Sequence, residues 1–288
     1  MSRALQRIDA LLAEASAKLK KSGIASDDAP LLLAHCMGVT KESLLTHSER
    51  ELNLAEQRYA SYLIAERCKG YSIAVLTGSR EFYGHKFYVT KDTLVPRPES
   101  ELLVNLAIVY LRKRAAGSVL DIGTGSGNLI ISIASALGRS KFEYYASDIA
   151  EAALAVAERN ARAHRVDVRF FYSNLFENIP KKKFSCIVAN LPYLTAEQLA
   201  EPSIKYEPIG ALWGGTRGTE LYQHFLSEVE PFLNPHGMVC IEIDPDQKNA
   251  LMELARTYFP TATIDCLPDL SSRSRVIQIQ NPDPDTLQ

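Results

Sequence analysis

Residues 118–131 of this 288-residue chain have the sequence SVLDIGTGSGNLII, and this stretch decides the fold. An apolar run ends at Asp121 and Ile122, glycines follow at alternate positions from 123 to 127, and an apolar helical pattern begins at Asn128. This is how a buried parallel strand passes into a helix. Glycines suit such a turn because a Cβ would forbid its backbone angles and would keep a ligand away from the main chain. The stretch therefore predicts a nucleotide-type loop, with the free N–H groups of the helix directed at the ligand.

The dinucleotide fingerprint G-x-G-x-x-G is the main competing interpretation of this loop. It would need a glycine at position 128, where this chain has Asn128. Asp148 ends the next expected strand, residues 143–148, and a carboxylate there can accept hydrogen bonds from both hydroxyls of a ribose. Asp121 before the glycines and Asp148 after the second strand favour a class I S-adenosylmethionine methyltransferase over a nicotinamide enzyme.

Strands and helices alternate from residue 118 to the end of the chain. We expect further strands at residues 143–148, 168–172, 184–189, 238–243, 261–267 and 275–280, and helices at 128–137, 151–164, 220–233 and 247–259. Such alternation predicts an α/β fold, a Rossmann-like, doubly wound and mostly parallel seven-stranded sheet. Ligands of such sheets bind at the carboxyl ends of the strands. Gly123–Gly127, Asp148, Asn174 and Asn190–Tyr193 should therefore converge on one crevice.

Composition restricts the class of protein. A hydrophobic content of 46% and a formal net charge of −2 indicate a soluble globular chain with one large and one small domain, and without the basic excess of a nucleic-acid-binding protein. The five cysteines are scattered with no C-x-x-C pair, which argues against a metal site or disulfide framework and fits a cytoplasmic protein. No apolar run approaches the roughly 20 residues that a membrane span needs.

The domain organisation follows from changes along the chain. Residues 1–76 are expected to form a helical domain, since Leu5, Ile8, Leu12, Ala15 and Leu19 recur at helical spacing. Residues 77–97 are expected to be a linker with a β-hairpin, residues 98–280 the catalytic domain, and residues 281–288 a disordered tail.

The tetrapeptide Asn190-Leu191-Pro192-Tyr193 at the end of the fourth strand carries the predicted chemistry. The side-chain oxygen of Asn190 and the backbone carbonyl of Leu191 can both accept hydrogen bonds from one planar NH2 group, because Pro192 holds that carbonyl extended. Such a nitrogen is a poor nucleophile, so two acceptors that align it with a sulfonium methyl and disperse its developing charge would promote transfer. The ring of Tyr193 can stack on the planar group.

With these features in place, the chain resembles the HemK/PrmC family, the N5-glutamine methyltransferases that modify the Gly-Gly-Gln loop of peptide chain release factors. The resemblance runs nearly end to end. It is carried by Gly70–Ile73, Gly78, Glu81–Gly84, Val95–Glu101, the glycine loop with Asp121, Asp148, Asn190–Tyr193, Glu207-Pro208, Ala211-Leu212, Gly214-Gly215, Glu242-Ile243 and Arg275-Val276. The Pro96–Glu99 block discriminates best, since ordinary class I methyltransferases lack it.

The resemblance implies a role for each site residue. S-adenosyl-L-methionine would be bound by Gly123, Thr124, Gly125, Ser126 and Gly127 at its methionine part, by Asp148 at the ribose, and by Asn174 and Leu175 near the adenine, with Asn190 bordering it. The glutamine substrate and the catalytic step would be served by Asn190, Leu191, Pro192 and Tyr193. The helical domain would help to dock the release factor. The protein would act as a cytoplasmic monomer, without a metal ion, stable nucleic-acid binding or membrane attachment.

Three positions depart from the family pattern. Leu191 replaces the first proline of Asn-Pro-Pro-Tyr, but it still supplies a backbone carbonyl, with some loss of rigidity. Asn174 stands where an acid is usual near the adenine, and it can still accept a hydrogen bond. Asp244 replaces a glycine, and nothing in the sequence explains that change.

These departures keep three alternatives open. Asn-Leu-Pro-Tyr also occurs in rRNA adenine dimethyltransferases, so N6-adenine methylation of nucleic acid is one alternative; the near-neutral charge and the Pro96–Glu99 block oppose it. A glutamine methyltransferase for a ribosomal protein is the second. The third is a cofactor-binding protein without catalysis, which the retained Asn190 and Tyr193 oppose.

Overall fold

The structure is a computed structural model that describes residues 5–201 and 204–282. Its described residues form two compact units, one of residues 5–79 with 204–206 and the other of residues 80–201 with 207–282. Most of the predicted tail, residues 283–288, lies outside the described residues. No described helix is long and apolar enough to cross a membrane.

The first unit is a bundle of short helices. They are α1 (Ile8–Lys21), α2 (Asp28–Met37), α3 (Lys41–Thr46), α4 (Leu54–Lys69) and α5 (Ile73–Thr77), with a small antiparallel pair of β1 (Gln6–Arg7) and β2 (Glu51–Leu52). Ile8, Ala15 and Leu19 of the predicted apolar stripe are buried. Leu5 was wrongly placed in that stripe: it precedes α1 and is 49% exposed, because the residues before Ile8 pair as a strand.

The second unit is built on a seven-stranded sheet of order β10-β11-β9-β8-β5-β6-β7. Its strands are β5 (Gly117–Ile122), β6 (Phe142–Asp148), β7 (Val168–Tyr172), β8 (Phe184–Ala189), β9 (Leu233–Glu242), β10 (Thr263–Pro268) and β11 (Ser274–Gln280). Strands β7, β6, β5, β8 and β9 are parallel, and β11 is antiparallel to both of its neighbours. The predicted mostly parallel seven-stranded sheet is confirmed.

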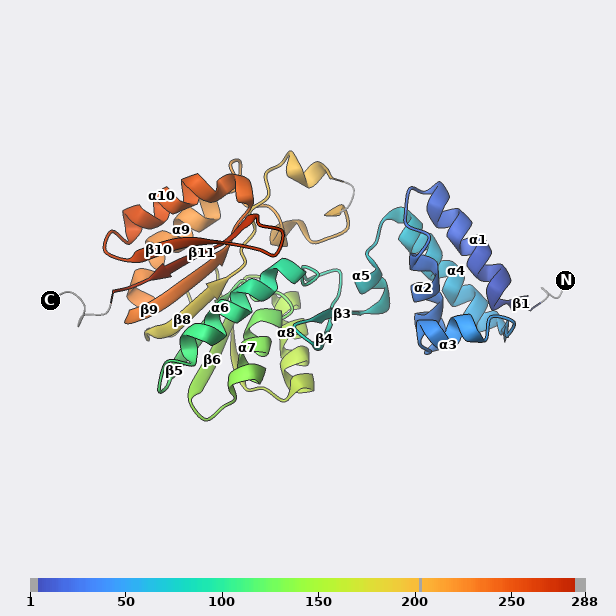
Figure 1. The fold of residues 1–288 in the computed structure, drawn as a ribbon, viewed down its shortest axis with the longest axis horizontal. Helices are drawn as coiled ribbons and strands as arrows, with labels where there is room; N and C mark the ends of the chain where they lie inside the picture. The colour runs from blue at the N-terminus through green and yellow to red at the C-terminus, as the bar shows by residue number, and fades with distance from the viewer. Residues whose placement is uncertain (1–4, 202–203, 283–288) are drawn as a thin grey trace. The chain divides into compact units, whose positions relative to one another are not determined.

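Helices cover both faces of this sheet (Figure 1). They are α6 (Glu101–Leu111), α7 (Asn128–Leu137), α8 (Glu151–His164), α9 (Glu220–Glu228) and α10 (Lys248–Tyr258), with short 3-10 turns η1 (Pro98–Ser100), η2 (Gln198–Ala200), η4 (Ile209–Ala211), η5 (Glu230–Phe232) and η6 (Pro245–Gln247). Helix α9 ends before the predicted residue 233, since Pro231 lacks a backbone N–H and disfavours continued α-helix at the residue before it.

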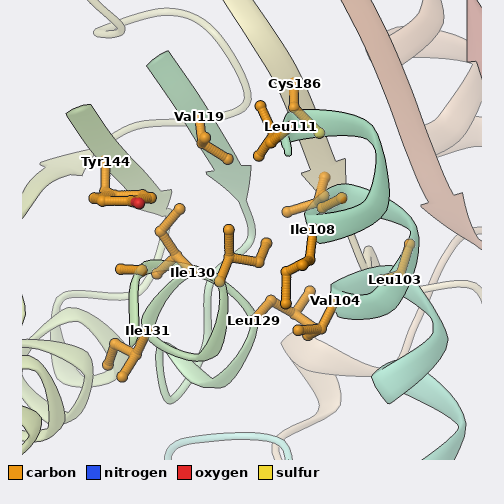
Figure 2. Packing of buried hydrophobic residues seen from close by; sticks show 14 of the residues in the cluster. Leu103, Val104, Ile108, Leu111, Val119, Leu129, Ile130, Ile131, Tyr144 and Cys186 are labelled. Atoms are coloured by element: carbon orange, nitrogen blue, oxygen red, sulfur yellow. The ribbon is translucent and has the colours of Figure 1, made fainter. Parts of the chain in front are cut away.

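Alternate residues along the central strands pack into two separate hydrophobic cores, one on each face of the sheet. Val119 packs in the cluster formed with α6 and α7, whereas the next residue, Leu120, packs in the cluster formed with α9 and α10. Figure 2 shows Leu129 and Ile130 of α7 close to Ile108 of α6, in the first of these clusters. Burial on both faces explains why these strands appear in the sequence as continuous apolar runs rather than as alternating ones.

A hairpin of β3 (Ser79–Phe82) and β4 (His85–Tyr88) precedes the sheet. Its two turn residues, Tyr83 and Gly84, have φ angles of 51° and 71°, as a type I′ turn requires. The side chain of Asn160 in α8 accepts from the N–H of Tyr88 at 2.8 Å and donates to the carbonyl of Ser126 at 2.8 Å. This buried amide connects the hairpin to the glycine loop.

Candidate active site

A cavity of about 410 Å³ lies where the carboxyl ends of β5, β6 and β8 meet. That volume falls in the range of about 300–1,000 Å³ that is typical of small-molecule sites. Most of the sequence-predicted site residues line it, namely Gly123, Thr124, Gly125, Ser126, Asp148, Asn174, Leu175, Asn190, Leu191 and Pro192. Gly127 and Tyr193 do not line it directly.

The glycine loop adopts backbone angles that favour glycine. Gly123, Gly125 and Gly127 have φ angles of 72°, 56° and 80°. A Cβ on Gly127 would lie 3.3 Å from the backbone Cα of Ala157 in α8, so close packing against that helix as well as the positive φ favours glycine there. A Cβ on Gly125 would meet no atom within 4 Å. The main chain is therefore open to a ligand at Gly125.

Asp148 supports this loop as well as lining the cavity. Its carboxylate accepts from the backbone N–H of Gly125 at 2.8 Å and from that of Ala150 at 2.9 Å. Burial raises the pKa of Asp148, and these backbone N–H donors oppose the rise.

The two residues predicted near the adenine differ in exposure. Asn174 is exposed, and its side-chain amide donates to the carboxylate of Glu177 at 3.0 Å. The neighbouring Leu175 is buried and has a left-handed backbone conformation with a φ of 46°.

Asp121 is fully buried beneath the loop. The hydroxyl of Thr124 donates to its Oδ2 at 2.7 Å, and its Oδ1 has no hydrogen-bond partner among the described residues. Burial raises the pKa of Asp121 to about 7. Burial therefore disfavours the ionised form of the acidic residue that precedes the glycines.

This pKa predicts a pH dependence of stability. The carboxyl of Asp121 ionises near pH 3.8 in the unfolded chain and near 7 in the folded one, so the folded state holds the extra proton in between. The free energy of unfolding should therefore fall as pH rises from about 4 to about 7, by up to roughly 1.4 kcal/mol per pH unit. Asp121→Asn should reduce that slope in urea denaturation from pH 4.5 to 8. Equal slopes for the two proteins would refute the assignment.

The segment Asn190–Tyr193 follows β8 directly, and hydrogen bonds and close packing hold several of its groups. The Nδ2 of Asn190 donates to the hydroxyl of Ser100 at 3.1 Å. The hydroxyl of Tyr193 donates to Oε1 of Glu242 at 3.3 Å. The carbonyl of Pro192 would be 2.5 Å from a Cβ on Gly214, so a glycine is required there for the two segments to pack. The tetrapeptide is therefore held by η1, by the end of β9 and by the loop that contains Gly214.

The buried side chain of Tyr222 forms hydrogen bonds with the backbone of Leu191. Its buried hydroxyl accepts from the N–H of Leu191 at 3.2 Å, and it lies within hydrogen-bond distance of two backbone carbonyls, that of Glu242 and, at 3.2 Å, that of Leu191. A proline at position 191 would have no N–H to satisfy. Leucine does have one, and Tyr222 provides its acceptor.

Tyr222→Phe should lower the free energy of unfolding by about 1–3 kcal/mol, because it leaves the N–H of Leu191 buried without a partner. Urea denaturation measures the change. Tyr172→Phe is the matched control, since Tyr172 is 54% exposed. A loss no larger than that of the control would contradict this role of Tyr222.

Two of the sequence blocks meet at the cavity. The guanidinium of Arg97 pairs with the buried carboxylate of Glu207, which lies 110 residues away in the sequence.

Asp244, which the sequence left unexplained, caps η6. Its Oδ1 accepts from the N–H of Asp246 at 2.9 Å, and its Oδ2 accepts from the side chain of Gln198 at 3.3 Å. The glycine-to-aspartate departure therefore has a structural role.

Ser100, Tyr222 and Glu242 received no role from the sequence. Glu242 offered a signal, because an acidic residue at the end of the apolar run 238–243 is rarely buried without a polar partner. Ser100 and Tyr222 offered none. Among residues 5–201 and 204–282, no group of three or more His, Cys, Asp or Glu side chains is arranged to hold a metal ion.

Comparison with known families matches both units. Residues 10–78 match the model of the PrmC N-terminal domain, and residues 99–205 match that of the methyltransferase small domain. The crystal structure of a methyltransferase from Pyrococcus furiosus shares the fold, with a TM-score of 0.53 and 18% identity over 77% of this chain and 100% of that one.

Relatives in sequence are more specific. A release factor glutamine methyltransferase from Burkholderia pseudomallei is 36% identical over 273 residues, 91% of this chain and 94% of the relative. One from Bordetella pertussis is 36% identical over 241 residues, 83% of this chain and 88% of the relative. The family predicted from sequence is thereby confirmed: the chain belongs to the release factor glutamine methyltransferases.

Proposed function

We propose that this protein transfers a methyl group from S-adenosyl-L-methionine to the side-chain amide nitrogen of the glutamine in the Gly-Gly-Gln loop of peptide chain release factors. One observation carries the proposal: Asn190 and Leu191 border the same cavity as the glycine loop and Asp148. An amide-binding pair and a nucleotide-type loop therefore face one another. The family relatives support the same reaction.

The residues that line the cavity fit this cofactor. Gly125 leaves the main chain open where the methionine part would lie, Asp148 offers a carboxylate to the ribose, and Leu175 offers an apolar surface to the adenine. When bound, S-adenosyl-L-methionine supplies an electrophilic methyl group on a sulfonium. Asn174 is open to solvent at the rim of the cavity and can still exchange hydrogen bonds with the adenine.

The protein's own part in the reaction is orientation and charge stabilisation. The Oδ1 of Asn190 and the carbonyl of Leu191 accept the two hydrogens of the glutamine NH2 and hold its nitrogen in line with the methyl. Both oxygens stabilise the positive charge that develops on that nitrogen during transfer. Pro192 lines the slot, and Tyr193, which does not line the cavity, supports this segment through its hydrogen bond to Glu242. We assign no strong general base, since the amide proton becomes acidic once the methyl has been transferred and can then leave.

The helical unit is proposed to dock the release factor, since residues 10–78 match the PrmC N-terminal domain. In this assignment the helical unit binds the release factor, and the second unit binds the cofactor and catalyses methyl transfer. We further propose that the protein works as a monomer in the cytoplasm, where release factors act.

A methyl-transfer assay with labelled S-adenosyl-L-methionine tests the function. The acceptors are a release factor with an intact Gly-Gly-Gln loop, the same factor with that glutamine replaced, a glutamine-bearing ribosomal protein, and bare rRNA. Label on the intact factor alone is the expected result. Label on rRNA would mean that Leu191 indicates an adenine substrate, and label on the ribosomal protein would redirect the assignment to that acceptor.

A further inference from the structure

A chain of buried hydrogen bonds runs from Asn190 into the core. Nδ2 of Asn190 donates to the hydroxyl oxygen of Ser100 at 3.1 Å, and that hydroxyl donates to Oε2 of Glu242 at 2.5 Å. Ser100 and Glu242 are each only 1% exposed. They come from η1 and from the last residue of β9, so this connection joins the segment that precedes α6 to the carboxyl end of a central strand.

The direction of these hydrogen bonds is set at the Glu242 end. Its Oε1 accepts from the hydroxyl of Tyr193 and its Oε2 from that of Ser100, and an ionised carboxylate accepts at both oxygens. Ser100 has one hydroxyl hydrogen, which is used on Glu242. Its oxygen must therefore face a donor, and the Nδ2 of Asn190 is that donor.

This direction leaves the side-chain oxygen of Asn190 for the cavity. Within the part of the chain that the structure describes, no protein group donates to Asn190 Oδ1, while Asn190 lines the cavity. A reversed amide would present its NH2 to the NH2 of a glutamine, so that two donors would face each other. The orientation of this amide thus decides whether Asn190 can hold the substrate.

We propose that Ser100 and Glu242 are positioning residues that fix the amide of Asn190 with its oxygen toward the substrate nitrogen. The inference deepens the proposed function and rests on it. Glu242 also holds Tyr193, so one buried carboxylate anchors both the first and the last residue of the tetrapeptide. Burial raises the pKa of Glu242, and the hydroxyls of Ser100 and Tyr193 together with the positive charge of Arg275 oppose that rise.

Ser100→Ala is the first test, because it removes the acceptor for Nδ2 without adding bulk. We expect kcat for release-factor methylation to fall about 10- to 100-fold, the loss typical of residues that orient a ligand-contacting group. Cofactor Kd, from calorimetry, should change by less than about twofold, because Ser100 acts through Asn190. Ser100→Thr retains the hydroxyl and should restore most of kcat.

Ser132→Ala is the matched control. Ser132 lies in α7 and is fully buried, and its hydroxyl has no hydrogen-bond partner among the described residues. It removes the same atom from the same domain but away from Asn190, so kcat should stay near that of the unaltered protein. A kcat loss in Ser132→Ala equal to that in Ser100→Ala would mean that the effect is one of packing, and would overturn the proposal.

A second variant tests the connection itself. Glu242→Met removes both acceptor oxygens and replaces the buried carboxylate with an apolar side chain of similar length. Because removing one member of a buried charged network can destabilise a fold, urea denaturation must first show that the variant is folded. The substitution should lower kcat, because the hydroxyl of Ser100 is then free to donate to Asn190 Oδ1 instead. In the double variant Ser100→Ala/Glu242→Met the two losses should be less than additive, since Glu242 acts on Asn190 through Ser100. The part of the Glu242→Met loss that acts through Tyr193 remains.

The outcomes separate this proposal from the proposed function. Absence of label on the release-factor glutamine with the unaltered protein, located by mass spectrometry, would refute the proposed function and the positioning role that rests on it. Normal methylation that Ser100→Ala leaves intact would refute only the positioning role. Additive losses in the double variant, or a loss that Ser100→Thr fails to restore, would also overturn it.

Discussion

Asn190→Ala should lower kcat for release-factor methylation by about 10²- to 10³-fold, the loss expected when one preorganised contact to developing charge is removed. The substitution deletes the oxygen that would accept a hydrogen of the substrate NH2 while the nitrogen becomes positive. Because that charge is largest in the transition state, kcat should fall far more than cofactor affinity. The cofactor would still be held by the glycine loop and Asp148.

Single-turnover methylation with labelled S-adenosyl-L-methionine, together with calorimetric cofactor binding, measures the two effects separately. Asn105→Ala is the matched control: Asn105 is exposed on α6, and its Oδ1 accepts from the hydroxyl of Tyr83 at 2.8 Å. The control should keep nearly the full rate. An Asn190→Ala protein that also kept most of its rate would show that the tetrapeptide does not grip the substrate.

Asp148→Ala should weaken cofactor binding by about 10²-fold, since hydrogen bonds to a charged group contribute about 1.5–3 kcal/mol each and each 1.4 kcal/mol is tenfold. Two losses combine here. The ribose would lose its carboxylate, and the N–H of Gly125 would lose the acceptor that now lies 2.8 Å from it. The loop that receives the methionine part would be less well ordered.

Calorimetry with S-adenosylhomocysteine measures this change without turnover. Asp167→Ala provides the matched control, because Asp167 is an exposed carboxylate just before β7, at the end of that strand opposite the cavity. The affinity of the Asp167→Ala variant for S-adenosylhomocysteine should equal that of the unaltered protein. Equal affinities for the two variants would remove Asp148 from the ribose site, whatever the effect on activity.

Local patterns were enough to predict the second unit's strands and its loop. The strands Val168–Tyr172 and Phe184–Ala189 have the predicted boundaries, because short apolar runs bounded by polar residues leave few alternatives. The glycines from 123 to 127 predicted a turn whose backbone angles a Cβ would forbid, and all three glycines have positive φ angles. Boundaries were less accurate where a short turn intervenes: β9 begins at Leu233, earlier than its apolar pattern indicated.

The sequence by itself determined the sheet, the glycine loop, the position of Asn190 at the end of a strand, and the family to which the chain belongs. Only the tertiary structure revealed what supports these residues. Ser100 and Glu242 are 142 residues apart in the sequence, and their hydrogen bond forms only because η1 and β9 pack together. A serine or tyrosine hydroxyl has the same local pattern whether it is solvated or buried, so no periodicity identifies its partner. Folding decides which donors and acceptors meet, and here it decides how the amide of Asn190 is oriented.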